Sequence, residues 1–123
     1  MLLAGIDLVE IKRIKKSMIN PRFLLRILGP TEYSQLELRG FSVQSVAASF
    51  SAKEAFSKAL GTGLRGFLLS EVELLREDNG KPYFKLSGSA LQITQERKIV
   101  LHVSVTHTRE YASAVVIGEE PDK

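Results

Sequence analysis

The chain has 123 residues, a formal charge of +3 at pH 7, and 44% apolar and 25% charged residues. This length fits one domain with one core, and the composition excludes a disordered chain. Because the sequence contains no cysteine, disulfides, thiolate metal sites and thiol nucleophiles are excluded, and any metal must bind oxygen or histidine.

The first residues predict a strand followed by a basic helix. Leu2 to Val9 is an apolar run typical of a buried strand, and Ile11, Ile14 and Met18 then recur at helical spacing. The run is too short to span a membrane, and its acidic residues do not suit a signal peptide. We therefore expect a cytoplasmic protein without a membrane partner.

A basic patch covers the predicted helix and the residues after it. Its members follow one another with no acid between Glu10 and Glu32: Lys12, Arg13, Lys15, Lys16, Arg22 and Arg26. Such a patch attracts nucleic acid, phosphates or an acidic protein, unless it is simply a solvated helix face. Nucleic acid is disfavoured, because Phe23 is the only aromatic residue available for stacking.

The middle of the chain contains the most regular helical pattern. Two short helices are expected over residues 23–28 and 31–39. Ser42 then begins an alanine-rich helix from Val43 to Leu60, which Gly61 ends at the left-handed stop position. This long helix is the main element that we expect to cover a sheet.

The second half of the chain predicts antiparallel strands. Residues 71–76 and 82–86 flank an Asn-Gly turn, which is the pattern of a β-hairpin. After a helix that ends near Arg97, residues 99–105 and 112–117 form a second antiparallel pair. Gly118 to Lys123 is expected to be a flexible tail. Together the elements predict a small single α+β domain of residues 1–123, with the long helix on a mostly antiparallel sheet.

Two acidic residues interrupt apolar patterns. Glu54 falls on the stripe of the long helix that carries Val46 and Phe50, and Asp7 is the sole charge of the first strand. An unpaired buried carboxylate costs several kcal/mol, so a positive group must compensate. The candidates are a helix pair of Glu54 with Lys58, a salt bridge from Asp7 to a base such as Lys53, or Mg²⁺ held by Asp7 and Glu54.

Two further features lie at predicted turns. Gly61-Thr62-Gly63 follows Lys58 and offers backbone N–H groups to a phosphate, although a helix stop followed by a turn explains the same residues. His107 lies in the last turn, where its imidazole either is solvated or binds a phosphate or transfers a proton. His102, inside a predicted strand, is interpreted as structural.

Four ordered motifs carry a resemblance that runs nearly end to end. They are GIDLVE at residues 5–10 with Arg13-Ile14, FSAKEA at 50–55 running into KALGTG at 58–63, NGKP at 79–82, and VSVTHT at 103–108. The chain resembles the holo-[acyl-carrier-protein] synthase family of phosphopantetheinyl transferases. The resemblance implies transfer of phosphopantetheine from coenzyme A to a serine of apo acyl carrier protein, with release of adenosine 3',5'-bisphosphate, in fatty acid biosynthesis.

The resemblance also implies roles for individual residues. Asp7 and Glu54 would bind Mg²⁺, with Asp7, Glu54 and Lys58 as the catalytic group. Lys58, Gly61, Thr62, Gly63, His107 and Thr108 would bind coenzyme A, and Arg13, Arg22 and Arg26 would contact the acidic carrier protein. Members of this family are small α+β proteins that assemble as homotrimers with sites between subunits.

One departure from the family pattern concerns a phosphate contact. Ser49 stands where the family usually has an arginine, and Ser51 stands where alanine is common, which we interpret as a mild change. Loss of a bidentate arginine either weakens coenzyme A binding or is replaced by Arg65 or Arg109. Two other functions are considered, namely a related transferase for polyketide or peptide synthase carrier domains, and a non-catalytic basic binding module.

Overall fold

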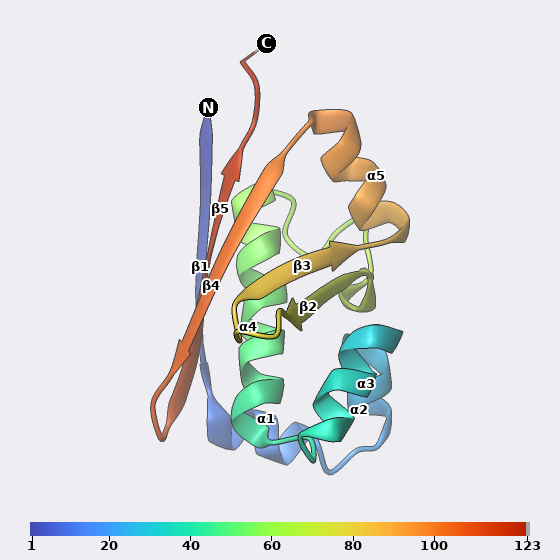
Figure 1. Ribbon diagram of the computed structural model, residues 1–123, viewed down its shortest axis with the longest axis vertical. Coiled ribbons are helices and arrows are strands. Elements are labelled where there is room, and N and C mark those ends of the chain that lie inside the picture. The colour runs from blue at the N-terminus through green and yellow to red at the C-terminus, as the bar shows by residue number, and fades with distance from the viewer. Residues whose placement is uncertain (123) are drawn as a thin grey trace.

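The computed structural model describes residues 1–122, and Figure 1 shows how the elements are arranged. The elements in chain order are β1 (Leu2–Glu10), α1 (Ile11–Ser17), α2 (Arg22–Ile27), α3 (Pro30–Leu38), α4 (Val43–Leu60), the 3-10 turn η1 (Leu69–Glu71), β2 (Val72–Arg76), β3 (Pro82–Leu86), α5 (Gly88–Arg97), β4 (Val100–His107) and β5 (Tyr111–Glu119). The predicted α+β class and both predicted antiparallel pairs are confirmed.

The strands form two antiparallel sheets rather than one. The larger sheet has the order β1-β5-β4, so that β1 and β4 are its two edges, and β2 pairs with β3 in a separate hairpin. Antiparallel strands can be joined by a tight turn, as β4 and β5 are, but β1 pairs with β5 across almost the whole chain. This distant pairing places Leu2 beside Glu119.

Helix α4 lies against the larger sheet and is the centre of both hydrophobic clusters (Figure 1). Ser42 begins the helix by accepting a hydrogen bond from the Ser45 amide at 3.2 Å, and Gly61 ends it with a φ of 75°. The helix presents alanines to β5, which carries Ala112 and Ala114 on its facing side. These small side chains let the helix lie close to the sheet.

A buried ion pair attaches α3 to α4. Lys53 Nζ donates to Glu32 Oε1 at 2.7 Å, and both side chains are completely buried. Glu32 also accepts hydrogen bonds from the backbone amides of Gly29 and Leu74. Because these partners come from α3, α4 and β2, the pair joins three elements at one buried point.

The C-terminal prediction needs correction. Strand β5 continues through Gly118 to Glu119, and Glu120 forms a salt bridge with Arg97, at 2.6 Å between its Oε2 and the arginine Nε. The Met1 and Glu120 backbones also exchange two hydrogen bonds. The start of the expected tail is therefore part of the sheet, because pairing with β1 satisfies its backbone, and Lys123 lies outside the described residues.

In the part of the chain that the structure describes, no helix combines the length and the apolar character needed to cross a membrane.

Candidate active site

Gly5 decides how closely β1 approaches α4. A Cβ atom at this position would lie 2.1 Å from the Ala55 carbonyl oxygen and 2.5 Å from the Ala59 amide nitrogen, which are both backbone atoms of the helix. Only glycine permits such contact between a strand and a helix backbone. The close approach places Asp7, two residues further along the same face of β1, directly against α4.

Two side chains of α4 hold the Asp7 carboxylate. Ser51 Oγ donates to Asp7 Oδ2 at 3.1 Å, and Lys58 Nζ lies 3.2 Å from Asp7 Oδ1. Lys58 also donates to the Ile6 carbonyl at 3.0 Å. The expected salt bridge from Asp7 to a basic residue is therefore present, but its partner is Lys58 and not Lys53, which is buried with Glu32.

Ser51 is a site residue that sequence reasoning missed. Its replacement of the common alanine was interpreted as a mild change, yet its hydroxyl contacts both the carboxylate and the backbone carbonyl of Asp7. The available signal was its position one helical turn before Glu54, which puts both side chains on the same side of α4. Because Asp7 and Glu54 were expected to lie together, a hydroxyl on the Glu54 side of the helix was a candidate partner for the Asp7 carboxylate.

Glu54 lies beside Asp7, partly buried. Burial raises the pKa of the Glu54 carboxyl above its ordinary value, and the nearby Asp7 charge raises it further. Lys58 and Arg13 act in the opposite direction and lower the same pKa. The structure thus brings the two acids of the sequence prediction together, and it adds Arg13 of α1 to the same neighbourhood.

The donor atoms at this point fit a hard divalent cation. Mg²⁺ takes carboxylate ligands from proteins, and water and substrate phosphates complete its shell. Asp7 and Glu54 offer two such carboxylates, and the negative charge of Asp7 disfavours that of Glu54. No cluster of three or more histidine, aspartate or glutamate side chains suited to a metal occurs among residues 1–122. Asp7 and Glu54 therefore offer two carboxylates, fewer ligands than such an ion takes, and further ligands would have to come from water or a substrate.

The glycine loop after α4 has the conformation that its glycines allow. Gly61 and Gly63 have φ values of 75° and 60°, which side-chain-bearing residues rarely adopt. The Thr62 hydroxyl donates to the Gly63 carbonyl at 2.8 Å, and the loop is largely exposed. The loop begins three residues after Lys58, so its backbone is accessible near the cation of that side chain.

His107 and Thr108 lie at the opposite edge of the larger sheet from Asp7. His107 ends β4 and is exposed, whereas the Thr108 hydroxyl accepts hydrogen bonds from the Glu110 and Tyr111 amides and stabilises the turn. Asp7 lies on the opposite edge strand, with β5 between. With strands about 4.8 Å apart, the β1 and β4 backbones are separated by roughly 10 Å.

A hollow of about 420 Å³ begins at His107. Its lining comes from α3, α4, β2 and β4 and consists of Arg39, Gln44, Ser45, Ala48, Arg76, Val105, Thr106 and His107. We call it the arginine hollow. Within one chain, it is on the β4 side of α4, whereas Asp7 and Glu54 are on the β1 side.

A second hollow, of about 430 Å³, lies on the basic face of α1. Lys12, Lys15 and Lys16 surround apolar surface from Met18, Ile19 and Val43. We call it the lysine-rimmed hollow. Arg22 and Arg26 are exposed on the neighbouring helix α2, so the basic patch of the sequence is also a surface patch of the folded chain.

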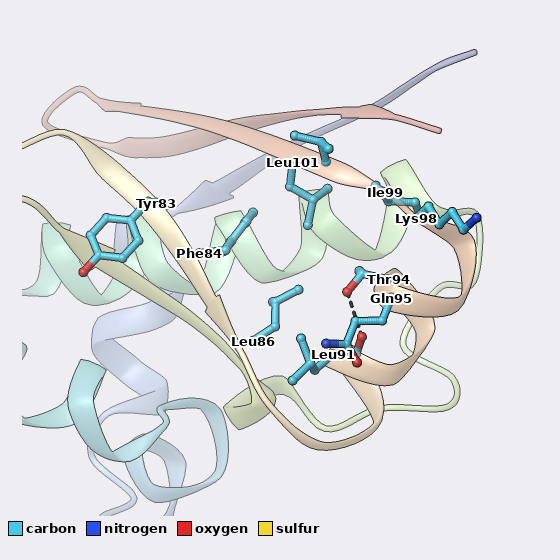
Figure 2. A pocket seen from close by; sticks show the side chains of 10 residues that line it. Tyr83, Phe84, Leu86, Leu91, Thr94, Gln95, Lys98, Ile99 and Leu101 are labelled. Carbon is cyan, nitrogen blue, oxygen red and sulfur yellow. Dashed lines mark hydrogen bonds between the residues drawn. The ribbon is translucent and has the colours of Figure 1, made fainter. Parts of the chain in front are cut away.

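A third hollow, of about 540 Å³, has a different character (Figure 2). It lies where β3, α5 and β4 meet, and Figure 2 shows Phe84, Leu86 and Leu101 pointing into the space between these elements. Among the described residues that line it, Lys98 alone carries a charge. Size alone does not identify a reaction site, and this lining offers no acid, so we place the candidate site at Asp7 and Glu54.

Comparison with known proteins identifies the class. Residues 4–116 match the family described as the 4'-phosphopantetheinyl transferase superfamily. The chain belongs to this family.

Particular members are similar over nearly the full length. The chain is 38% identical to the holo-[acyl-carrier-protein] synthase of Halothermothrix orenii, over 94% of this chain and 95% of that protein. The crystal structure of the Neisseria meningitidis holo-[acyl-carrier-protein] synthase superimposes with a TM-score of 0.89 at 31% identity, covering 96% and 98% of the two chains. The Helicobacter pylori enzyme in complex with coenzyme A gives a TM-score of 0.82 at 30% identity, covering 95% and 100%.

Proposed function

We propose that this protein is a holo-[acyl-carrier-protein] synthase that acts in the cytoplasm in fatty acid biosynthesis. It transfers phosphopantetheine from coenzyme A to a serine of apo acyl carrier protein and releases adenosine 3',5'-bisphosphate. The observation that carries the proposal is the pair Asp7 and Glu54, brought together from distant parts of the chain beside Lys58. Relatives with the same name across nearly the full length support it.

The residues divide the work of a phosphoryl transfer, which is mainly positioning and neutralisation of charge. Asp7 and Glu54 would hold Mg²⁺, which when bound stabilises negative charge on phosphate oxygens. Ser51 and Lys58 fix the orientation of the Asp7 carboxylate, and Lys58 brings a positive charge to the side where the phosphates lie. The carrier serine oxygen forms a bond to phosphorus, the bond to the departing bisphosphate breaks, and the serine proton is released.

The basic face of α1 and α2 is the expected binding surface for the carrier protein. Arg13 lies near Glu54, while Arg22 and Arg26 extend the positive surface away from the site. The lysine-rimmed hollow adds apolar surface, including Ile19 at 81% exposure. Apolar contact surrounded by positive charge suits an amphipathic acidic helix, and an acyl carrier protein is strongly acidic.

The exposed side of the larger sheet supports a homotrimer. Leu2, Ile6 and Leu8 of β1 are 74%, 65% and 64% exposed, and the strand register puts Val100 of β4 on the same face. Such an apolar face favours association with a second copy. A cyclic trimer brings unlike surfaces of neighbouring copies together, so the β1 edge of one copy would meet the β4 edge of the next. Asp7 and Glu54 would then complete a site with His107 from a neighbouring subunit.

The proposal is tested by incubating the protein with coenzyme A, Mg²⁺ and an apo carrier protein, and weighing the carrier by mass spectrometry. The carrier should gain the mass of one phosphopantetheine group. Glu54→Gln should lower the rate by at least about 100-fold, as expected when a group that stabilises transition-state charge is lost. Glu37→Gln, on the exposed side of α3, is the matched control and should retain the rate. Full activity of Glu54→Gln would exclude this assignment of the site.

The same assay separates the alternatives. A non-catalytic binding module leaves the carrier mass unchanged. A transferase for polyketide or peptide synthases modifies those carrier domains in preference to the fatty acid carrier.

A further inference from the structure

The guanidinium of Arg97 connects three separate parts of the chain. Arg97 is the last residue of α5, and its Nη1 donates to the carbonyl of Leu60, the last residue of α4, at 2.8 Å. Its Nε and Nη2 donate to the two carboxylate oxygens of Glu120 at 2.6 and 3.3 Å. Glu120 follows β5 and exchanges backbone hydrogen bonds with Met1. We call Arg97, Glu120 and the Leu60 carbonyl the terminal clamp.

The terminal clamp caps α4 at its C-terminal end. The last carbonyls of a helix have no partner within the helix, and a cation is favoured beside them. The Gly61 amide donates to the Ser57 and Lys58 carbonyls, and Arg97 donates to that of Leu60. Two parallel contacts with one carboxylate fix the plane of the guanidinium, so Glu120 directs Nη1 toward Leu60.

The capped carbonyl directly precedes the glycine loop. Gly61, Gly63 and Gly66 have positive φ values of 75°, 60° and 86°, and glycine has more backbone freedom than any other residue. The loop therefore loses much conformational entropy when it is ordered for a ligand, and that loss weakens binding. A contact that fixes the start of the loop before the ligand arrives reduces this cost.

Helix α5 lies against the loop at both of its ends. Arg97 contacts Leu60 where the loop begins, and a Cβ atom built on Gly66 would lie 3.8 Å from Ile93 Cδ1. Ile93 and Arg97 are four residues apart, so they lie on the same side of α5. This side of α5 is thus the support of the loop, and Arg97 is its polar contact.

We propose that Arg97, oriented by Glu120, is a positioning residue that holds the Gly61–Gly63 loop in the conformation that binds coenzyme A. The inference rests on the proposed function, in which this loop binds that substrate. All three guanidinium nitrogens of Arg97 are engaged by Glu120 and Leu60, so Arg97 acts through the loop and not on the substrate. Because Glu120 pairs with Met1, the two ends of the chain support the loop as well.

Steady-state kinetics of Arg97→Ala, with coenzyme A and apo carrier protein varied in turn, test this role. The KM for coenzyme A should rise about tenfold, the effect of losing a hydrogen bond from a charged group, while kcat and the KM for the carrier stay near the wild-type values. A merely structural role would lower the folded fraction and the apparent kcat but not change the KM. Arg97→Lys should show a smaller rise, because lysine keeps the charge but not the planar fork.

The matched control is Glu96→Ala. Glu96 is exposed on α5, next to Arg97 in the sequence, and accepts a hydrogen bond from Gln92 at 3.2 Å. This variant should keep both KM values. A wild-type KM for coenzyme A in Arg97→Ala, or an equal rise in both KM values, would overturn the role of Arg97.

Hydrogen exchange measures the loop without any transfer reaction. In Arg97→Ala, the amides of residues 61–66 should exchange about tenfold faster than in the wild-type protein, while those in the first half of α4 keep their rates. Unchanged exchange of residues 61–66 would overturn the inference. Absence of transfer by the wild-type protein would contradict the proposed function, and exchange would then still decide whether Arg97 holds the loop. If Arg97→Ala does not fold, Arg97→Lys decides by the same measurements.

Discussion

At the scale of single residues, the position of Asp7 depends on the absence of a Cβ atom at Gly5. Gly5 has no Cβ, so β1 lies against the α4 backbone, and Asp7 then reaches Ser51 and Lys58. A small movement of the strand would move the carboxylate away from Glu54. The position of the site residue is therefore determined by a glycine that carries no chemistry.

Gly5→Ala should affect both stability and transfer. The new methyl group would meet backbone atoms at 2.1 and 2.5 Å, which cannot rotate away, so we expect a loss of about 1–3 kcal/mol in the free energy of unfolding. Transfer should fall further than the folded fraction, because Asp7 is displaced. Urea denaturation and the carrier mass assay measure the two effects.

Gly118→Ala is the matched control in the same sheet. A Cβ there would contact side-chain atoms of Ile99 and Leu3 at 3.2 to 3.4 Å, and side chains can adjust. We expect a smaller loss of stability and normal transfer. Equal effects of the two substitutions would contradict the proposed role of the close backbone approach.

The sequence predicted the acids of the site but not their hydrogen-bond partners. Asp7 and Glu54 were recognisable because a charge interrupts an apolar period, which is a local signal. Their basic partners were not, because the choice between Lys53 and Lys58 depends on which way α4 faces β1. Lys53 points to Glu32 and Lys58 to Asp7. The four-residue spacing places Lys58 on the Glu54 side of the helix, but it does not show that Asp7 of β1 lies against that side.

At the scale of elements, the Glu32 and Lys53 pair fixes α3 against α4 and β2. Burial raises the pKa of Glu32 and lowers that of Lys53, so each charge is tolerated only because the other is present. Lys53 Nζ also donates to the Val72 and Leu69 carbonyls, and Glu32 accepts two backbone amides. The pair therefore saturates polar groups at the junction of three elements.

Lys53→Met should destabilise the fold by about 3–5 kcal/mol at pH 7, because it leaves a buried carboxylate without its cation. Without Lys53, which lowers the Glu32 pKa, that pKa must rise further. The folded state then binds a proton more tightly than the unfolded state, so the deficit should shrink as the pH falls toward the ordinary glutamate value. Urea denaturation at pH 7 and pH 5 measures this change.

Lys81→Met serves as the control, since Lys81 is exposed in the turn between β2 and β3. It should cost little at either pH. A Lys53→Met deficit that does not change between pH 7 and pH 5 would mean that Glu32 is not the group left unpaired.

The elements that the sequence predicted well are those with local signals. Helix α4 has its cap at Ser42 and its stop at Gly61, and strand β3 has the predicted bounds Pro82–Leu86. The pairing of β1 with β5 could not be predicted, because it joins residues more than 100 positions apart. The prediction of a flexible tail from Gly118 was wrong for the same reason. The backbone of this segment pairs with β1, and no local sequence pattern indicates that distant pairing.

At the scale of the whole molecule, the apolar outer face of the larger sheet has to be covered by another copy if the homotrimer is correct. Ile6→Lys would put a charge at the centre of that face, so we expect monomers by light scattering after size-exclusion chromatography, with normal circular dichroism and little transfer. Leu68→Lys is the matched control, because Leu68 is 66% exposed but lies before η1, away from the sheet. Trimers of Ile6→Lys would exclude this face as the interface.

Mixed assemblies test whether one reaction site uses two subunits. Asp7 and His107 lie on the two opposite edge strands of the larger sheet within a chain, so in the proposed trimer a complete site takes Asp7 and Glu54 from one copy and His107 from the next. Co-expressed Glu54→Gln and His107→Ala chains should then form some intact sites. Random assembly into a cyclic trimer gives an intact combination at about one interface in four, so transfer at limiting coenzyme A should recover to about a quarter of the wild-type rate. Chains that carry both substitutions, mixed with Glu54→Gln chains, should show no recovery. If a single chain supplied both residues, the first mixture would stay at the residual rate of its His107→Ala chains, because every subunit would lack one half of its own site.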